Sequence, residues 1–150
     1  MSVTAAQGFV AAGVRAGIRK TAPDLAVVRS TTPAVGAAMF TVNQVQAAPV
    51  VVSKAHLAIA EPQAVVINSG VANAATGQRG ELDAIATAAE AGRLLDLDAE
   101  EVLVLSTGVI GALLPLERVL GGLRDAAPAV SGHRPRVRVG PARSLCRARP

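Results

Sequence analysis

The stretch Val102-Leu103-Val104-Leu105-Ser106-Thr107-Gly108-Val109-Ile110-Gly111 gives the strongest indication of both a fold element and a site. Its apolar run predicts a buried strand that ends at Ser106-Thr107-Gly108. At such a strand end the Thr107 hydroxyl and the Gly108 backbone N–H are two hydrogen-bond donors, and the amide is unobstructed because glycine has no Cβ. Two donors that converge on one point can stabilise an oxyanion during acyl transfer. A polar turn that only closes the strand is the alternative interpretation.

A second polar segment, Asn68-Ser69-Gly70-Val71-Ala72-Asn73-Ala74-Ala75-Thr76-Gly77, follows another apolar run and precedes a helical stretch. Asn and Ser side chains at a strand end can bond to the backbone of their own loop or to a ligand. Loops at strand ends also carry binding groups in many folds. We expect the two polar segments to converge on one site, with Asn68 and Asn73 in contact with a substrate. A loop whose amides satisfy only its own backbone is the alternative.

The remaining chain reads as alternating strands and helices. Hydrophobic patterns and turn residues predict strands over 8–14, 25–29, 35–40, 64–67 and 102–105, and helices over 80–95 and 115–125. Between them, residues 45–53 are expected to form a strand that leads into a short helix near 54–58. Within 80–95, five residues fall near one helical face: Leu82, Ile85, Ala86, Ala89 and Leu95. This alternation predicts an α/β, or layered α+β, architecture.

The composition limits which residue types can form the core and which partners the protein can be expected to bind. Apolar residues make up 51% of the chain, but there are only two Phe and no Trp or Tyr, so small and branched aliphatic residues must form the core. A chain with so few aromatic side chains is poorly suited to base stacking, and we expect no nucleic-acid partner. No apolar run approaches the length of a membrane span, and we expect none. The single cysteine, Cys146, fits a reducing compartment, so we expect a cytoplasmic protein.

The last twenty residues differ from the rest. Six of the fifteen basic residues are arginines within 131–150, a segment with no acidic residue, whereas 1–130 holds nine basic and eleven acidic residues. Three prolines interrupt any regular pattern there. We therefore divide the chain into a packed domain, 1–130, and an Arg- and Pro-rich tail, 131–150, which we expect to be disordered or an out-of-frame ending. A basic extension that binds RNA is the competing interpretation.

Several segments in this order resemble the ornithine acetyltransferase (glutamate N-acetyltransferase) family of arginine biosynthesis, over about residues 1–130. They are Gly8-Phe9 with Gly13; Ala38-Met39-Phe40-Thr41 with Asn43; Ala47-Ala48-Pro49-Val50; Asn68-Ser69-Gly70 with Ala72-Asn73-Ala74 and Thr76-Gly77; and Ser106-Thr107-Gly108-Val109-Ile110-Gly111 with Pro115.

The resemblance implies the N-terminal, alpha-chain-like part of a self-processing acyltransferase of the N-terminal-nucleophile type. Members transfer an acetyl group from N-acetylornithine to glutamate, and some also use acetyl-CoA as a co-substrate; no bound cofactor is implied. A precursor cleaves itself before a Thr, which becomes the nucleophile, and the alpha and beta chains form a heterotetramer. The Thr–Gly pair of the oxyanion hole maps onto Thr107 and Gly108.

The nucleophile implied by the family has no counterpart in this chain. The cleavage motif and the Thr-Thr-Asp-Thr segment of the family do not occur, and the pairs Ala75-Thr76 and Ala86-Thr87 lie in unsuitable contexts. We therefore expect the chain alone to be inactive. A related self-processing hydrolase fragment and a non-enzymatic remnant are the alternatives. His56 has no candidate nucleophile near it in sequence and is expected at the surface, and no residue spacing indicates a metal site.

Overall fold

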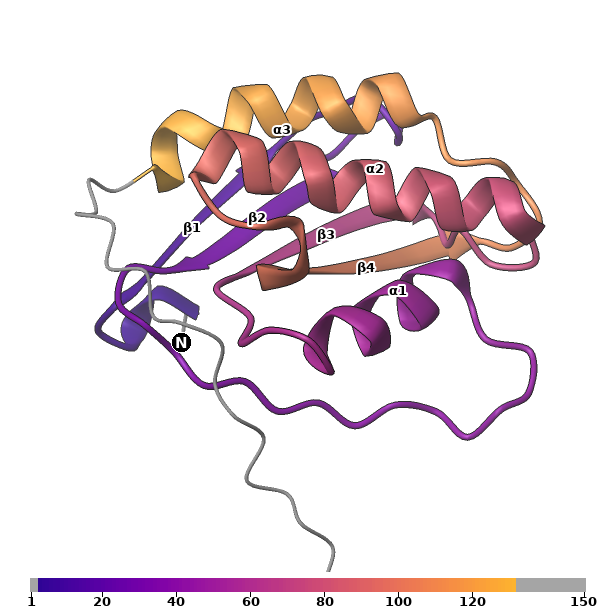
Figure 1. Cartoon of the computed structure of the whole chain (residues 1–150). Helices are drawn as coiled ribbons and strands as arrows, with labels where there is room; N and C mark the ends of the chain where they lie inside the picture. The colour runs from indigo at the N-terminus through magenta and orange to yellow at the C-terminus, as the bar shows by residue number, and fades with distance from the viewer. Residues whose placement is uncertain (1–2, 132–150) are drawn as a thin grey trace, which may run out of the picture.

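Four strands form one mixed sheet in the computed structural model, which describes residues 3–131 (Figure 1). The elements in chain order are β1 (Phe9–Val14), β2 (Leu25–Ser30), α1 (Ala48–Leu57), β3 (Ala64–Val71), α2 (Gly77–Leu95), β4 (Val102–Val109) and α3 (Leu116–Val130), with short 3-10 helices at Val3–Ala5 and Ala99–Glu101. The strand order is β1-β2-β3-β4, so β1 and β4 are the edge strands.

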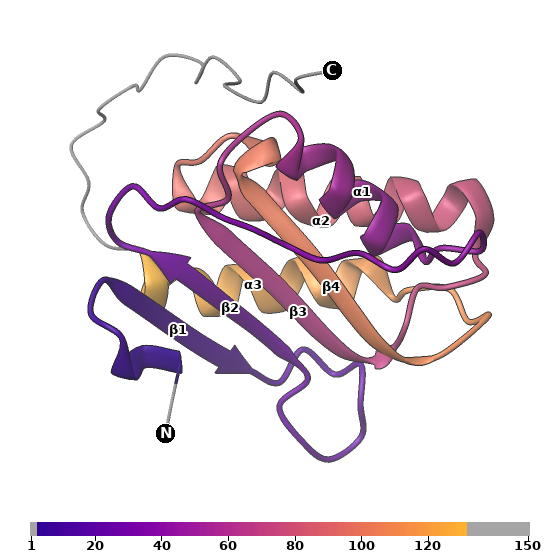
Figure 2. The same cartoon turned by 90° about the horizontal axis from the view of Figure 1, so that it is seen from below.

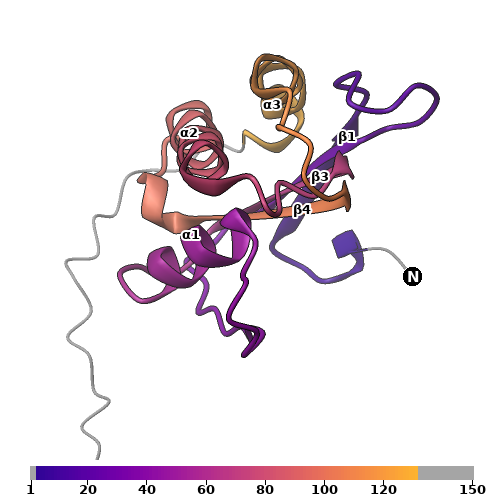
Figure 3. The same cartoon turned by 90° about the vertical axis from the view of Figure 1, so that its right-hand side faces the viewer.

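The topology follows from how neighbouring strands are connected. β1 pairs with β2, and β2 with β3, in antiparallel orientation, whereas β3 and β4 are parallel. A parallel pair requires a crossover connection, which α2 provides. Figure 3 shows α2 and α3 together on one face of the sheet, and α1 beside β4 below the sheet in that view.

The two faces of the sheet differ in how well they are covered. Residues that face α2 and α3 are buried, and Leu25, Val27 and Val66 are at most 2% exposed. Except for the buried Ser30 at the end of β2, the residues that alternate with them are only partly covered. Figure 2 shows this second face from below. We call it the open face, and its apolar side chains are Phe9, Ala11, Ala26, Val28, Val65, Ile67, Leu103 and Leu105.

The predicted layered α/β architecture is confirmed, and so is the aliphatic core. Apart from Pro49, the buried apolar side chains of residues 3–131 are all Ala, Val or Leu. Small side chains let the helices approach the sheet closely, and a Cβ on Gly122 of α3 would come within 2.7 Å of the Leu25 Cδ2 atom. No helix within 3–131 combines the length and the apolar character that crossing a membrane requires.

Two predictions for residues 35–53 are wrong. Residues 35–40 form no strand. At and just before this segment, side chains rather than a neighbouring strand meet two backbone donors: Gly36 donates to the Glu61 carboxylate and Ala34 to the Gln63 side chain. Residues 48–53 begin helix α1 instead of a strand. Pro49 suits a first helical turn, and packing of Val52 in the core outweighs the strand preference of the valines.

The predicted apolar face of α2 is largely wrong, because only Leu95 of its five residues is buried, at 3% exposed. Leu82 and Ile85 are 55% and 47% exposed, whereas Ala84, Ala88 and Ala91 are at most 2% exposed. The face with the smaller side chains packs on the sheet because it brings the helix axis closer to the strands. The prediction assumed that the most hydrophobic side chains of the helix are the buried ones, and it therefore placed the opposite face of α2 against the sheet.

Both polar segments continue a strand instead of ending it. β3 runs on to Val71 and β4 to Val109, and the parallel register pairs Asn68 with Ser106 and Gly70 with Gly108. Residues 132–150, which make up almost all of the predicted tail, lie outside the described residues.

Glu90 links α2 to α3. Its carboxylate accepts hydrogen bonds from Arg93 Nε at 2.8 Å on the same helix and from Arg124 Nε at 2.9 Å on α3. The hydrogen bond from Arg93 is the largest influence on this group; together with the Arg124 contact it outweighs burial and lowers the pKa of Glu90 from 4.5 to about 2.

Acid should therefore weaken the contact between α2 and α3. Because the pKa of Glu90 is depressed in the folded state, its stabilising contribution is complete above the ordinary pKa of 4.5 and is lost as the pH falls toward 2. Glu90→Gln should reduce the loss of unfolding free energy measured by urea titration over this pH range. Glu81→Gln, at an exposed position of the same helix, should leave the pH dependence unchanged. Identical slopes for all three proteins would contradict the prediction.

Candidate functional site

Alternate backbone groups of β4 point away from β3, toward the free edge of the sheet. Ser53 of α1 accepts a hydrogen bond from the Val104 N–H at 2.9 Å and donates one to the Val104 carbonyl at 2.8 Å. Val109, in contrast, offers its carbonyl to the Ala72 N–H at 2.9 Å, toward β3. Backbone groups alternate in direction along a strand that pairs on one side, so the N–H of Gly108 points to the free edge like that of Val104.

Helix α1 covers only the first half of this edge. The Nδ1–H of His56 donates to the Val102 carbonyl at 2.9 Å, next to the Ser53 contacts. His56 is 9% exposed, so its expected surface position is wrong: it satisfies a backbone group of an edge strand. The outward backbone groups of Ser106 and Gly108 lie beyond these two contacts along β4.

Removing the Ser53 hydroxyl should destabilise the fold measurably. Ser53 is 4% exposed, and Ser53→Ala would leave the Val104 N–H and C=O buried without this partner. We expect a loss of about 1–3 kcal/mol in unfolding free energy from denaturant titration. Lys54→Ala, at the exposed neighbouring position, should change it by no more than about 0.5 kcal/mol. A Ser53→Ala variant as stable as the control would show that the contact between Ser53 and the Val104 backbone does not contribute to the free energy of unfolding.

The Thr107 side chain lies on the open face. Strand alternation puts it on the same side as Leu103 and Leu105, and Thr107 and Gly108 are both exposed. The structure thus places a hydroxyl-bearing side chain at the end of the open face and the next backbone amide at the free edge of the sheet. Both predicted hydrogen-bond donors are therefore exposed on the surface formed by residues 3–131.

The backbones of Gly70 and Gly108 are in direct contact. A Cβ on Gly108 would lie 2.3 Å from the carbonyl carbon of Gly70 and 2.6 Å from the Val71 nitrogen. Gly70 and Gly108 have φ of +116° and +133°, a region that residues with a side chain rarely adopt. Glycine is therefore required at position 108 for space and for conformation alike.

Asp24 holds the loop 15–22 against the other side of Gly70. Its buried carboxylate accepts hydrogen bonds from the backbone N–H groups of Ala16 at 2.7 Å and Arg19 at 2.6 Å. Burial alone would raise the pKa of Asp24, but these backbone hydrogen bonds lower it below its ordinary value. The Arg19 Cγ atom lies 2.9 Å from where a Gly70 Cβ would be, so the loop packs directly on this glycine.

Asn68 and Asn73, the two predicted substrate contacts, lie on the other side of the sheet from Thr107. Asn68 is 4% exposed, donates to the Val71 carbonyl at 2.9 Å and accepts from the Ser106 hydroxyl at 2.5 Å. Asn73 is fully buried in the loop just before α2. The structure therefore brings Thr107 and Gly108 together but does not bring either asparagine side chain to the open face. A substrate contact for the asparagines stays a prediction.

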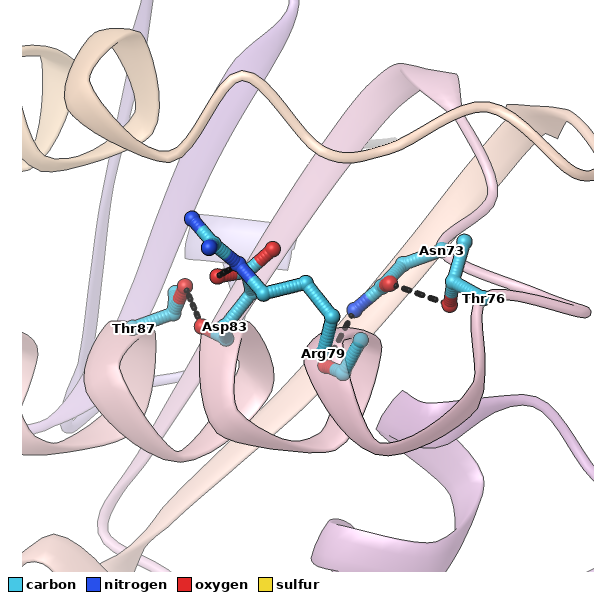
Figure 4. A network of polar contacts seen from close by, with 6 residues as sticks. Asn73, Thr76, Arg79, Asp83 and Thr87 are labelled. Carbon is cyan, nitrogen blue, oxygen red and sulfur yellow. Dashed lines mark hydrogen bonds and ion pairs between the residues drawn. The ribbon is translucent and has the colours of Figure 1, made fainter.

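Figure 4 shows the polar contacts of Asn73 with the first turns of α2. Its amide donates to the Gly80 carbonyl at 2.9 Å and its oxygen accepts from the Thr76 hydroxyl at 2.9 Å. Further along the helix, Asp83 pairs with Arg79 at 3.0 Å, and Thr87 donates to the Asp83 carbonyl at 2.7 Å. Thr76 and Thr87, the threonines of the two Ala–Thr pairs, thus both use their hydroxyls inside the fold.

A small cavity of about 10 Å³ adjoins Asn68 and Asn73. It is lined by the two asparagines together with Thr87 and Ser106 and several apolar residues. A space of this size holds about one water molecule, not an amino acid. Among residues 3–131, no three His, Cys, Asp or Glu side chains gather into a group suited to a metal ion.

Ser106 is the residue of the site that sequence reasoning did not single out. The two polar segments share a spacing, since Asn68 and Ser106 each stand two residues before a glycine. Had the strands been aligned by their glycines, this spacing would have indicated that the two side chains face each other across a parallel pair.

Comparison with known proteins places these features in a family. The model of the ArgJ family matches residues 10–146, a range that runs past Val130 into the Arg-rich segment. The arginine biosynthesis bifunctional protein ArgJ of Streptomyces coelicolor is 52% identical over 135 residues, which is 89% of this chain and 35% of that protein. The protein of the same name from Caldanaerobacter subterraneus is 47% identical over 125 residues, 83% of this chain and 31% of that protein.

Two solved structures are similar in both fold and sequence. An ArgJ protein of Bacillus halodurans has a TM-score of 0.80 and 41% identity, over 83% of this chain and 65% of that one. An ornithine acetyltransferase of Mycobacterium tuberculosis, crystallised with ornithine, has a TM-score of 0.80 and 44% identity, over 84% of this chain and 69% of that one. The chain spans about a third of the length of the curated relatives that it matches. On the extent of these matches, the chain belongs to the ArgJ family.

Proposed function

We propose that this chain is the oxyanion-stabilising part of an acetyltransferase that moves an acetyl group from N-acetylornithine to glutamate. The observation that carries the proposal is the placement of Thr107 and Gly108: an exposed hydroxyl next to a backbone N–H that points to the free edge of β4. Membership in the ArgJ family supports it, as does the name of the Mycobacterium tuberculosis relative.

The chemistry explains why two such donors are useful. A threonine hydroxyl attacks the acetyl carbonyl carbon, and negative charge develops on the carbonyl oxygen. The Thr107 O–H and the Gly108 N–H would stabilise this oxyanion. The intermediate then collapses, the C–N bond breaks, and ornithine leaves with the proton taken from the nucleophile. The glutamate amine next attacks the resulting ester, forms N-acetylglutamate and returns the proton to threonine. The cycle needs no bound cofactor, and acetyl-CoA would serve only as another acetyl donor.

We place the nucleophile on a polypeptide segment outside these 150 residues, because the cleavage motif of the family does not occur among them and the hydroxyls of Thr76 and Thr87 are engaged inside the fold. The open face is the surface on which that polypeptide would lie, since its apolar side chains are partly exposed and Thr107 stands at its end. A polypeptide bound over the open face would exclude water from the apolar side chains and place its own side chains next to Thr107. A complementary beta chain, in a heterotetramer in the cytoplasm, fits this arrangement.

The lengths of the relatives support a precursor that is cut in two. The solved Bacillus halodurans chain is matched over 65% of its length, whereas the curated relatives are matched over only 35% and 31% of theirs. The crystallised polypeptide is therefore much shorter than the curated proteins. Self-processing into two chains accounts for this difference.

Complementation tests the proposal directly. The 150-residue chain is assayed for acetyl transfer from N-acetylornithine to glutamate, first alone and then with the polypeptide that corresponds to the unmatched part of the Streptomyces coelicolor protein. We expect no turnover from either polypeptide alone and transfer from the mixture. Turnover by the chain alone would refute the need for a second polypeptide. Release of acetate without transfer would favour a hydrolase, and an inactive mixture that still forms a complex would favour a non-enzymatic remnant.

A further inference from the structure

Asn68 and Ser106 form a bridge between the two parallel strands. They are register partners, and the Ser106 hydroxyl donates to the Asn68 side-chain oxygen at 2.5 Å. The Asn68 side-chain nitrogen donates to the Val71 carbonyl at 2.9 Å. Because Asn68 is only 4% exposed and uses both ends of its amide, it ties β4 at Ser106 to β3 at a point beyond Gly70.

A second contact follows two residues further along β4. Gly108 lies so close to Gly70 that a Cβ would approach the Gly70 carbonyl oxygen to 2.4 Å. Beyond the glycines, the Ala72 N–H donates to the Val109 carbonyl at 2.9 Å. The Thr107–Gly108 peptide is thus held by the Asn68–Ser106 bridge on one side and by the glycine contact and the Val109 hydrogen bond on the other.

We propose that Asn68 is a positioning residue, which acts through Ser106 to fix the direction of the Gly108 N–H. The inference rests on the proposed function, in which this N–H is an oxyanion donor. Such donors accelerate a reaction because they are already oriented when charge develops. A donor held in place by buried hydrogen bonds is oriented more exactly than one on a free loop. The role differs from a substrate contact, for which Asn68 would need a free polar atom directed at the open face.

The test measures the rigidity of the Gly108 amide by ¹⁵N relaxation in the full 150-residue chain. We compare the unsubstituted chain with Ser106→Ala, which removes the bridge, and Ser106→Thr, which keeps the hydroxyl. Ser69→Ala is the matched control, since Ser69 neighbours the bridge on β3 but has its side chain on the open face.

The order parameter of the Gly108 N–H should be about 0.85 in the unsubstituted chain, in Ser106→Thr and in Ser69→Ala, and should fall below about 0.6 in Ser106→Ala. The amides of β1 and β2 should keep their values in all four proteins. An unchanged Gly108 in Ser106→Ala, or an equal loss of order across the whole sheet, would overturn the proposal.

The unsubstituted chain provides a test that does not depend on how well Ser106→Ala folds. If the Gly108 amide there is as mobile as residues 36–45, which have no regular structure, the bridge does not fix it and the proposal is wrong. The measurement requires no turnover. Its failure is therefore distinct from a failure of acetyl transfer in the complementation assay.

Discussion

Replacing Gly108 with alanine should lower the free energy of unfolding by about 3 kcal/mol or more, because two unfavourable effects combine. The new Cβ would lie 2.3 Å from the Gly70 carbonyl carbon, so the β3 and β4 backbones must separate. The φ of +133° is also unfavourable for any residue that has a Cβ. Denaturant titration followed by circular dichroism measures the change.

Gly13→Ala is the control for this substitution. Gly13 also lies in a strand, but nothing stands within 4 Å of the place where its Cβ would be, and its φ is ordinary. We expect a change within about 0.5 kcal/mol, since an unstrained surface substitution has little effect. Equal losses in the two variants would mean that the contact between Gly70 and Gly108 is not as tight as described.

The second large effect concerns catalysis. In the complex of this chain with its complementary polypeptide, Thr107→Ala should lower kcat by about 10²–10³, the cost of losing one oxyanion donor. KM should change little, because the hydroxyl is needed when charge develops and not for substrate binding. Steady-state kinetics of acetyl transfer from N-acetylornithine measures both constants.

Thr107→Ser separates the hydroxyl from the rest of the side chain. Serine keeps the O–H and should retain most of the activity. Since Thr107 is exposed, neither variant should lose much stability, and thermal unfolding checks this. A Thr107→Ala complex with nearly unchanged kcat would remove Thr107 from the oxyanion hole.

The elements that sequence reasoning identified correctly are those defined by local patterns. The strands that became β1 and β2 and the existence of α2 follow from the spacing of residues close in the chain. The strand expected at 35–40 does not form, and the backbone donors of Ala34 and Gly36 instead meet the side chains of Gln63 and Glu61, more than twenty positions away. The prediction of which face of α2 is buried was wrong because close approach of the helix to the sheet favours alanine over leucine at the contact.

The residues of the candidate site show the same difference between local and long-range signals. Thr107 and Gly108 were identified because a hydroxyl and a glycine after an apolar run form a local signal. The burial of His56 and the bridge from Asn68 to Ser106 depend on partners 46 and 38 residues away. Only the register of β3 and β4 and the position of α1 bring these residues together, and neither is encoded in a short stretch of sequence.

The contacts that Ser53 and His56 make with β4 have a consequence for the chain when it is produced by itself. Because α1 side chains occupy the backbone groups of Val102 and Val104 that point away from β3, a neighbouring molecule cannot add a strand along the first half of the free edge of β4. Fibril-like growth by strand addition is thereby hindered. Aggregates should instead form by stacking of uncovered apolar surfaces, and a charged substitution such as Leu105→Lys should keep more of the protein in the supernatant than any change at the border of β4.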